Sequence, residues 1–272
     1  ILYPLSILLV DSMYVDQELT LSVFVRIFEM HAFRKAITNT LLLGLVTGIL
    51  GTIIGFLFAY VDAYVNVGSR MVTRLFGAVS ILPVVSPPFV LSLSAILLFG
   101  RTGLITRGIF NLSSTKLYGL PGIALVQTLT FFPVCYLMLK GLLRNIDPSI
   151  EEAARSMGAS RWKVFATVTL PLMLPGLGNA FLITFIESVA DFANPMIIGG
   201  NYDTLATSIY LQLTGAYDKS GATAMAVVLL TVSMGLFVME KYWLERKAVA
   251  TLTGKASRER MAISDSSVRR PL

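Results

Sequence analysis

Residues 149–171, SIEEAARSMGASRWKVFATVTLP, form a charged, helix-capable block between long apolar spans. Pro148 extends a preceding helix poorly because proline has no backbone N–H group. Asp147 or Ser149 can therefore cap a new helix. Ser149 and Glu152 also have the spacing of a capping box, in which each side chain bonds the backbone N–H of the other residue. The pattern predicts a short helix that begins here.

The second half of the block predicts another short helix after a turn. We expect Gly158 to end the first helix, since glycine adopts turn conformations at little steric cost. Ser160 can cap a second short helix, which is expected to run as far as Thr167. The next membrane helix is expected to begin at Pro171. Physical grounds alone leave two interpretations of this surface helix–turn–helix open, a docking element and an ordinary amphipathic interfacial loop. The second would also carry Arg155, Arg161, Trp162 and Lys163.

The composition of the 272-residue chain indicates a membrane protein. Charged residues make up 14% of the chain, against roughly 25% in soluble proteins. Hydrophobic residues make up 55%, and a water-soluble fold of this length could not bury so much apolar surface. The single cysteine, Cys135, lies in an apolar span, so no disulfide can form within this sequence.

Apolar segments near the ~20 residues that cross a bilayer recur along the chain. Helix is expected because lipid offers the backbone no hydrogen-bond partners. We interpret residues 1–10 as the end of a truncated first helix and residues 11–35 as a periplasmic segment. This predicts an all-α integral membrane fold with about six crossings. The five complete spans are 36–60, 75–99, 120–143, 172–198 and 222–239.

One set of alternate connecting segments holds twice as many Lys and Arg residues as the other. Because cytoplasmic loops are enriched in these residues, we expect the richer set, the helix–turn–helix and both ends of the intact unit in the cytoplasm. The net charge of +6 then reflects orientation and not nucleic-acid binding. The segment 244–272 is expected to be a solvated tail or linker. The richer set is 61–74, 144–169 and 241–272, and the poorer set is 11–35, 100–119 and 199–221.

Glu187 lies well inside the span 172–198, and an ionisable residue within a membrane helix is a functional candidate by default. Thr184, Glu187, Asp191 and Asn194 follow helical spacing, which predicts one polar stripe. An acidic stripe suits a hard cation that prefers oxygen ligands. The alternative is a carboxylate bonded to a neighbouring helix, with Asp191 capping the end of the span.

Glycine and proline residues mark two further spans. Four glycine residues of the span 36–60 share one helical face, which predicts tight packing within the chain or a moving interface. Three proline residues interrupt the span 75–99 and indicate a kink or a pathway. For Gln127, in the next span, a pathway role and a purely architectural role both remain open. The glycine residues are Gly44, Gly48, Gly51 and Gly55, and the proline residues are Pro83, Pro87 and Pro88.

No residue pattern indicates catalysis or a resident metal ion. His31 has no second His or Cys beside it. The Gly254–Lys255 pair lacks the upstream glycine of a phosphate-binding loop, so we do not expect this chain to bind ATP by that route. Nothing resembles a nucleophile with a positioned base. We therefore expect no enzyme activity and no cofactor on this chain.

The block 149–171 resembles the EAA loop of binding-protein-dependent ABC importer permeases. That family's pattern reads E-A-A, three residues, G, nine residues, I, one residue and L-P, and here Val168 replaces Ile. The resemblance implies a permease core at 36–243 whose cytoplasmic loop, 144–171, couples ATP-driven motion to the membrane helices. The coupling residues that it implies are Glu151, Glu152, Ala153, Ala154, Gly158, Ala159, Leu170 and Pro171.

Other motifs resemble ferric-iron ABC permeases, most closely the amino-terminal half of a fused protein. The resemblance implies the bacterial inner membrane, a second permease half, a periplasmic substrate-binding protein and a cytoplasmic ABC ATPase dimer that holds ATP and Mg. The motifs are ILPVVSPPF at 81–89, LFGRTGLIT at 98–106, ESVADFANPMIIGGNY at 187–202 and ATLTGK at 250–255.

Two alternatives to ferric-iron import remain at this point. Related permeases for 2-aminoethylphosphonate, thiamine or polyamines share the loop and much of the architecture. A gradient-driven secondary transporter is the alternative from another class. Glu187 is compatible with it, but such a transporter needs no ATPase-docking loop.

Overall fold

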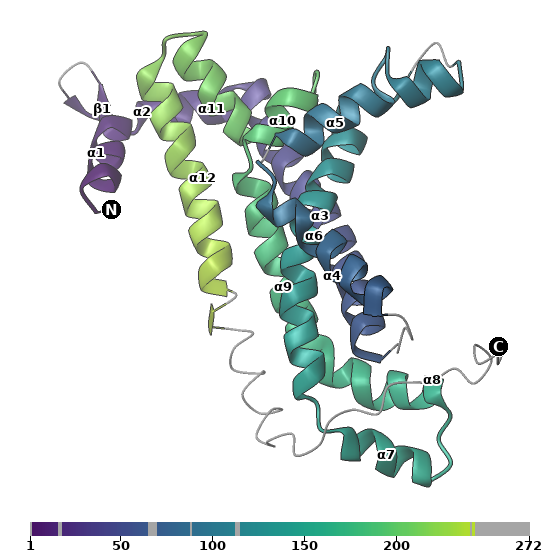
Figure 1. Ribbon diagram of the computed structural model, residues 1–272. Coiled ribbons are helices and arrows are strands. Elements are labelled where there is room, and N and C mark those ends of the chain that lie inside the picture. The colour runs from purple at the N-terminus through teal and green to yellow at the C-terminus, as the bar shows by residue number, and fades with distance from the viewer. Residues whose placement is uncertain are drawn as a thin grey trace. The chain divides into compact units, whose positions relative to one another are not determined.

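In the computed structural model, the described part of the chain is almost entirely helical (Figure 1). The tail 244–272, the motif at 250–255 and Pro88 lie outside the described residues, so the predictions made for them remain predictions. The described residues are 2–15, 18–64, 70–87, 89–111, 115–239 and 241–242.

The first third of the chain holds a small hairpin and five helices. Strands β1 (Tyr14–Val15) and β2 (Glu18–Leu19) pair antiparallel, with Tyr14 opposite Leu19. The helices are α1 (Leu2–Met13), α2 (Ser22–Glu29), α3 (His31–Tyr64), α4 (Arg70–Val85) and α5 (Val90–Phe99).

The rest of the described chain is helical between short connections. The π-helical turn η1 (Leu104–Ile109) precedes α6 (Leu120–Asn145). The other elements are α7 (Pro148–Ser156), α8 (Arg161–Val164), the π-helical turn η2 (Phe165–Thr169), α9 (Leu170–Ala190), α10 (Ala193–Ile198), α11 (Leu205–Thr214) and α12 (Lys219–Met239).

Five helical segments of the described chain are long and apolar enough to cross a membrane. Three of the expected spans, 36–60, 120–143 and 222–239, are confirmed as α3, α6 and α12. The segments are His31–Tyr64, Val90–Ile109, Leu120–Asn145, Arg161–Ala190 and Lys219–Met239.

The segment 75–99, which was predicted as a single span interrupted by prolines, is divided into two helices. Helix α4 ends at Val85 and α5 begins at Val90. Pro87 provides the physical reason, because proline lacks an N–H group and disfavours helix in the residue before it. The N–H of Val90 donates to the carbonyl of Pro87 at 3.0 Å, which starts the next helix.

The prediction for 172–198 also needs correction at both ends. The helix begins earlier, at Arg161, and α9 ends at Ala190. The separate helix α10 follows. The segment 199–221, expected to be a loop, contains the helix α11, whose N-cap Thr204 accepts a hydrogen bond from the N–H of Thr207. A ten-residue helix is too short to give a membrane-length hydropathy signal.

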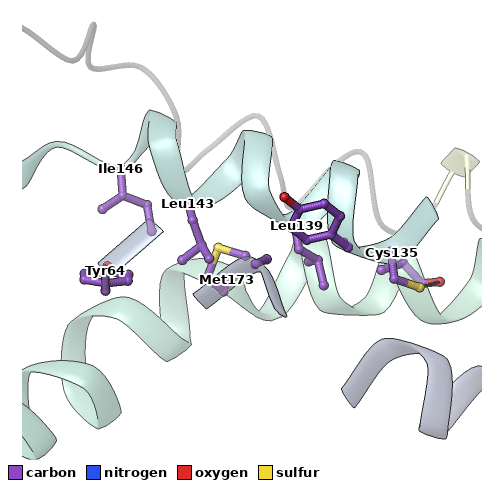
Figure 2. Close-up of a cluster of buried hydrophobic side chains, with 9 residues drawn as sticks. Tyr64, Cys135, Leu139, Leu143, Ile146 and Met173 are labelled. Carbon is purple, nitrogen blue, oxygen red and sulfur yellow. Dashed lines mark hydrogen bonds between the residues drawn. The ribbon is translucent and has the colours of Figure 1, made fainter. Parts of the chain in front are cut away.

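The residues pack as two compact units. The first draws on the described residues of 1–47, 87–128 and 185–238, and the second on those of 48–86 and 129–184. In the second unit, buried side chains of α3, α6 and α9 form a hydrophobic cluster (Figure 2). Its fully buried members include Tyr136, Leu139, Leu143 and Met173.

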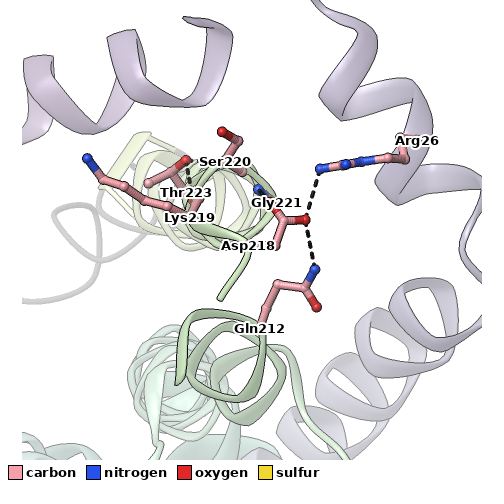
Figure 3. Close-up of polar contacts among 7 residues, drawn as sticks. All are labelled: Arg26, Gln212, Asp218, Lys219, Ser220, Gly221 and Thr223. Carbon is pink, nitrogen blue, oxygen red and sulfur yellow. Dashed lines mark hydrogen bonds and ion pairs between the residues drawn. The ribbon is translucent and has the colours of Figure 1, made fainter. Parts of the chain in front are cut away.

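In the first unit, Asp218 organises the start of α12 (Figure 3). Its carboxylate accepts the N–H of Gly221 at 2.8 Å, as a capping residue does, and pairs with Arg26 of α2 at 2.9 Å. Burial raises the pKa of Asp218, but the bonds from Gly221, Gln212 and Arg26 outweigh this and lower it. These contacts therefore stabilise the fold above the usual pKa of aspartate and weaken as the pH falls through the lowered value.

The glycine face of α3 packs tightly within the chain, as predicted. A Cβ atom at Gly55 would lie 2.9 Å from the backbone N of Tyr136 and 3.0 Å from the carbonyl O of Phe132. Real Cβ atoms do not approach backbone atoms so closely, so α3 and α6 need glycine at this position to come together.

We predict that Gly55→Ala lowers the free energy of unfolding by about 1–3 kcal/mol, the usual cost of overpacking a core. Gly141→Ala, on α6, is the matched control. A Cβ atom there meets nothing within 4 Å, so it should leave stability unchanged or raise it by up to ~1 kcal/mol. Thermal unfolding of the purified variants measures both, and equal effects would contradict the close-packing explanation.

Candidate functional site

The surface hairpin of α7 and α8 follows α6 and precedes α9 (Figure 1). Asp147 caps α7, since its Oδ1 accepts the N–H of Ser149 at 2.9 Å. This bond lowers the pKa of Asp147. The predicted capping box of Ser149 and Glu152 is wrong, because Pro148 occupies the first helical position, which suits its missing N–H and fixed φ. The residue before Pro148 therefore becomes the cap.

Gly158 ends α7 as predicted. Its φ of +84° lies in the left-handed region, where residues with a Cβ atom are strained. A Cβ atom there would meet nothing within 4 Å. The demand for glycine therefore comes from the backbone turn and not from crowding.

The start of the second helix is confirmed, but its end is not. Ser160 caps α8 and its Oγ accepts the N–H of Lys163 at 3.3 Å. The helix does not restart at Pro171, because α8, η2 and α9 run on without a break. We attribute this to η2, whose wider turn changes the hydrogen-bond register directly before a residue that has no N–H.

Glu151 fastens the hairpin to the helices around it. Its side chain is only 9% exposed. The carboxylate accepts hydrogen bonds from the hydroxyl group of Tyr64, on α3, and from Oγ1 of Thr169, on η2, the latter at 2.8 Å. A buried charge is stable only when it is bonded in this way. This role of Glu151 was not predicted from the sequence, because its partner Tyr64 lies 87 residues away.

Glu152 has the opposite environment and is exposed. Its side chain has no hydrogen-bond or ion-pair partner among the described residues, and its carbonyl group accepts Oγ of Ser156 at 3.0 Å. Ala153 is also exposed, and Met157 is 83% exposed. Helix α7 therefore turns a face with a carboxylate, a small residue and a thioether outward. Of the other implied coupling residues, Pro171 is exposed, and Ala154, Ala159 and Leu170 are half-buried.

A second polar site lies in the first unit, at the break between α9 and α10. Oδ1 of Asp191 accepts the N–H groups of Ala193 at 3.0 Å and Asn194 at 3.3 Å. Its Oδ2 accepts the side-chain amides of Gln127 and Asn194, both at 2.8 Å. All four donors converge on one carboxylate. The backbone N–H groups at the helix break are therefore hydrogen-bonded by a side chain.

Buried hydroxyl groups extend this polar cluster. Oε1 of Gln127 accepts Oγ of Ser188 at 2.6 Å and Oγ1 of Thr47 at 3.1 Å. Oδ1 of Asn194 accepts Oγ of Ser92 at 2.8 Å. The cluster thereby joins α3, α5, α6, α9 and α10. Thr47, Ser92 and Ser188 were not predicted, because single hydroxyl residues in apolar helices carry little signal.

The prediction of one polar stripe through 184, 187, 191 and 194 is wrong. Helical spacing holds only along a continuous helix, and α9 ends at Ala190. Thr184 is buried, and its Oγ1 lies 2.8 Å from Sγ of Cys135. Glu187 is exposed, and no hydrogen bond or ion pair joins it to another described residue. Asp191 accepts N–H groups at the start of α10, whereas the stated alternative placed it as a cap at the end of the span.

Within the described residues, no group of three or more His, Cys, Asp or Glu side chains has the arrangement of a metal site. His31 is the first residue of α3 and is exposed.

These features define a membrane permease with a surface hairpin, and solved structures show the same fold. A bacterial ABC transporter involved in the import of the acidic polysaccharide alginate matches with a TM-score of 0.77 and 18% identity, over 90% of each chain. An inward-facing structure of the MetNI methionine ABC transporter matches with a TM-score of 0.61 and 23% identity, over 78% of this chain and 94% of the other.

The chain belongs to the family of binding-protein-dependent transport system inner membrane components, which residues 51–248 match. It is 36% identical over 263 residues to the "Putative ferric transport system permease protein FbpB 1" of Haemophilus influenzae, covering 95% of this chain and 41% of that protein. It is 40% identical over 184 residues to the ferric transport system permease protein FbpB of Actinobacillus pleuropneumoniae, covering 66% and 27%. The chain thus spans less than half the length of either relative.

We predict that Asp191→Asn lowers the free energy of unfolding by about 1–3 kcal/mol. An asparagine NH₂ group would face the amide donors of Gln127 and Asn194 and leave buried donors unpaired. Glu187→Gln makes the same chemical change at an exposed position, and we expect an effect within about 0.5 kcal/mol. Thermal unfolding compares the two variants. Equal losses would show that the Asp191 contacts stabilise the fold no more than the exposed carboxylate of Glu187 does.

Proposed function

We propose that this chain is a permease half of an ATP-driven importer that carries ferric iron from a periplasmic binding protein to the cytoplasm. The observation that carries the proposal is the 36% identity over 95% of the chain to a protein named for ferric transport. The molybdenum transport system permease ModB of Escherichia coli K12 is more distant, with 30% identity over 63% of the chain. Ferric iron is therefore favoured over another cargo in the same family.

In this proposal the hairpin of α7 and α8 faces the cytoplasm and its outward face docks on a separate ATPase subunit, where ATP hydrolysis takes place. The exposed Glu152, Ala153 and Met157 support a protein contact, because a thioether next to a small residue adapts to an apolar partner surface. Glu151 supports transmission of the motion, because it ties α7 to the end of α3. A second permease half would complete the pathway.

We predict that Gly158→Asp and Glu152→Lys leave the protein in the membrane but abolish substrate-stimulated ATP hydrolysis by the assembled transporter. An aspartate at φ +84° costs about 1–2 kcal/mol in the native turn, which displaces the docking face. Lysine at 152 reverses the charge of that face. The measurement is ATP hydrolysis of the reconstituted complex with and without the loaded binding protein.

Glu152→Gln is the control for the charge reversal, since it keeps the size of the side chain and adds no positive charge. We expect it to retain most of the stimulation. Full iron uptake by Gly158→Asp or Glu152→Lys would rule out this hairpin as the coupling element.

Glu187 is the pathway candidate that we retain as a cation contact. It is exposed on α9, and an unpaired charge that faces hydrocarbon costs about 2.5–3.5 kcal/mol on insertion scales. We infer that it faces water or the second permease half and not lipid. Its negative charge suits the transport of a cation. The bonded Gln127, Asp191 and Asn194 have a structural role that explains them without substrate.

We predict that Glu187→Gln keeps normal membrane levels and lowers iron uptake by about fivefold, the effect of losing ~1 kcal/mol of charge attraction in a polar environment. Uptake of radioactive ferric iron by cells with matched permease levels measures this. Unchanged uptake by Glu187→Gln, together with lower membrane levels of Glu187→Ala, would assign Glu187 to packing. Uptake of another cargo in place of iron would contradict ferric iron as the substrate but leave the family membership unchanged.

A further inference from the structure

A cavity of about 380 Å³ opens between α3 and the hairpin, within the second unit. Aromatic residues form part of its lining. The ring of Phe165 lies 5.4 Å from that of Tyr60, 5.3 Å from that of Trp162 and 6.2 Å from that of Phe56. Leu57 and Val164 add aliphatic surface.

Two arginine residues also line this cavity, Arg155 on α7 and Arg161 on α8. Both side chains are exposed, and neither has an ion-pair or hydrogen-bond partner among the described residues. Glu151 lines the same cavity, but its carboxylate is buried and bonded to Tyr64 and Thr169. The accessible charge of the site is therefore positive.

We propose that this cavity binds an anionic phospholipid, with the phosphate group between Arg155 and Arg161 and an acyl chain against Phe56, Leu57 and Phe165. Arginine forms paired hydrogen bonds with phosphate oxygens. Aromatic rings such as those of Tyr60 and Trp162 are favoured at the level of lipid headgroups, and basic pockets beside membrane helices bind anionic headgroups.

The position of Phe56 and Leu57 favours a lipid over a soluble partner. They lie seven and eight residues before the end of α3 at Tyr64, which corresponds to about 11–12 Å along the helix axis. The cavity thus extends from the surface hairpin onto the apolar part of a membrane-spanning helix. An acyl chain reaches that depth, whereas a cytoplasmic protein contacts only the surface hairpin.

Trp162 offers a local probe of the site, because it lines the cavity and is one of two tryptophan residues in the chain. In a Trp243→Phe background, the permease is first reconstituted without its partner ATPase, into vesicles with equal amounts of phosphatidylglycerol and phosphatidylcholine. Bromine, which quenches tryptophan fluorescence at short range, is placed on the acyl chains of only one of the two lipids. Both samples therefore have the same surface charge.

We expect brominated phosphatidylglycerol to occupy the site about fivefold more than brominated phosphatidylcholine, the preference that one lysine or arginine contact gives. The double variant Arg155→Gln, Arg161→Gln should remove this preference. Lys163→Gln, which removes a charge from α8 outside the cavity lining, should retain it. Far-UV circular dichroism checks that each variant is folded.

Equal quenching by the two lipids in the unsubstituted site would overturn the proposal. So would an unchanged preference in the double arginine variant. Loss of the preference when the partner ATPase binds would assign Arg155 and Arg161 to a protein contact and also overturn it. The inference rests on membrane insertion and not on the cargo, so a failure of iron uptake leaves the quenching result standing and the reverse also holds.

Discussion

The constraint on which the structure depends is that lipid offers no hydrogen bonds to the backbone. Continuous helices meet it along α3, α6 and α12, and each interruption needs side chains that replace the missing partners. The break between α9 and α10 illustrates this. The two oxygens of Asp191 take two backbone N–H groups and two side-chain amides. A carboxylate with four donors is a stable way to end one helix and begin another.

The hairpin of α7 and α8, at the edge of the hydrophobic helices, also depends on side-chain hydrogen bonds. Two adjacent glutamates have different roles there because their environments differ. Glu151 is buried and bonded to Tyr64 and Thr169, so it sets where the hairpin lies on α3 and η2. Glu152 is exposed, so its charge is available to a partner. A helix of nine residues would be marginal in water alone, which is why such buried contacts matter.

The described charged residues include ion pairs within the chain and exposed charges that have no partner among the described residues. Asp62 pairs with Lys140 at 2.8 Å and with Arg144 at 3.5 Å. Glu187, Arg155 and Arg161 have no partner among the described residues. In a chain with only 14% charged residues, unpaired charges beside apolar helices point to ligands or partners outside the chain. Asp191 and Glu187 are acidic residues of one motif, but Asp191 is bonded within the chain and Glu187 is not.

From the sequence one could predict the all-α membrane class, three of the spans, the glycine turn at 158 and the permease family, because apolar length and a short motif are local properties. Which carboxylates are buried depends on the folded structure. The contact of Glu151 with Tyr64 and the convergence of Gln127, Ser92 and Thr47 around Asp191 and Asn194 join residues far apart in the chain. The helix break at Asp191 was also not predicted, because hydropathy does not detect a carboxylate that replaces backbone hydrogen-bond partners. The polar stripe was wrongly predicted because helical spacing assumes that the helix continues.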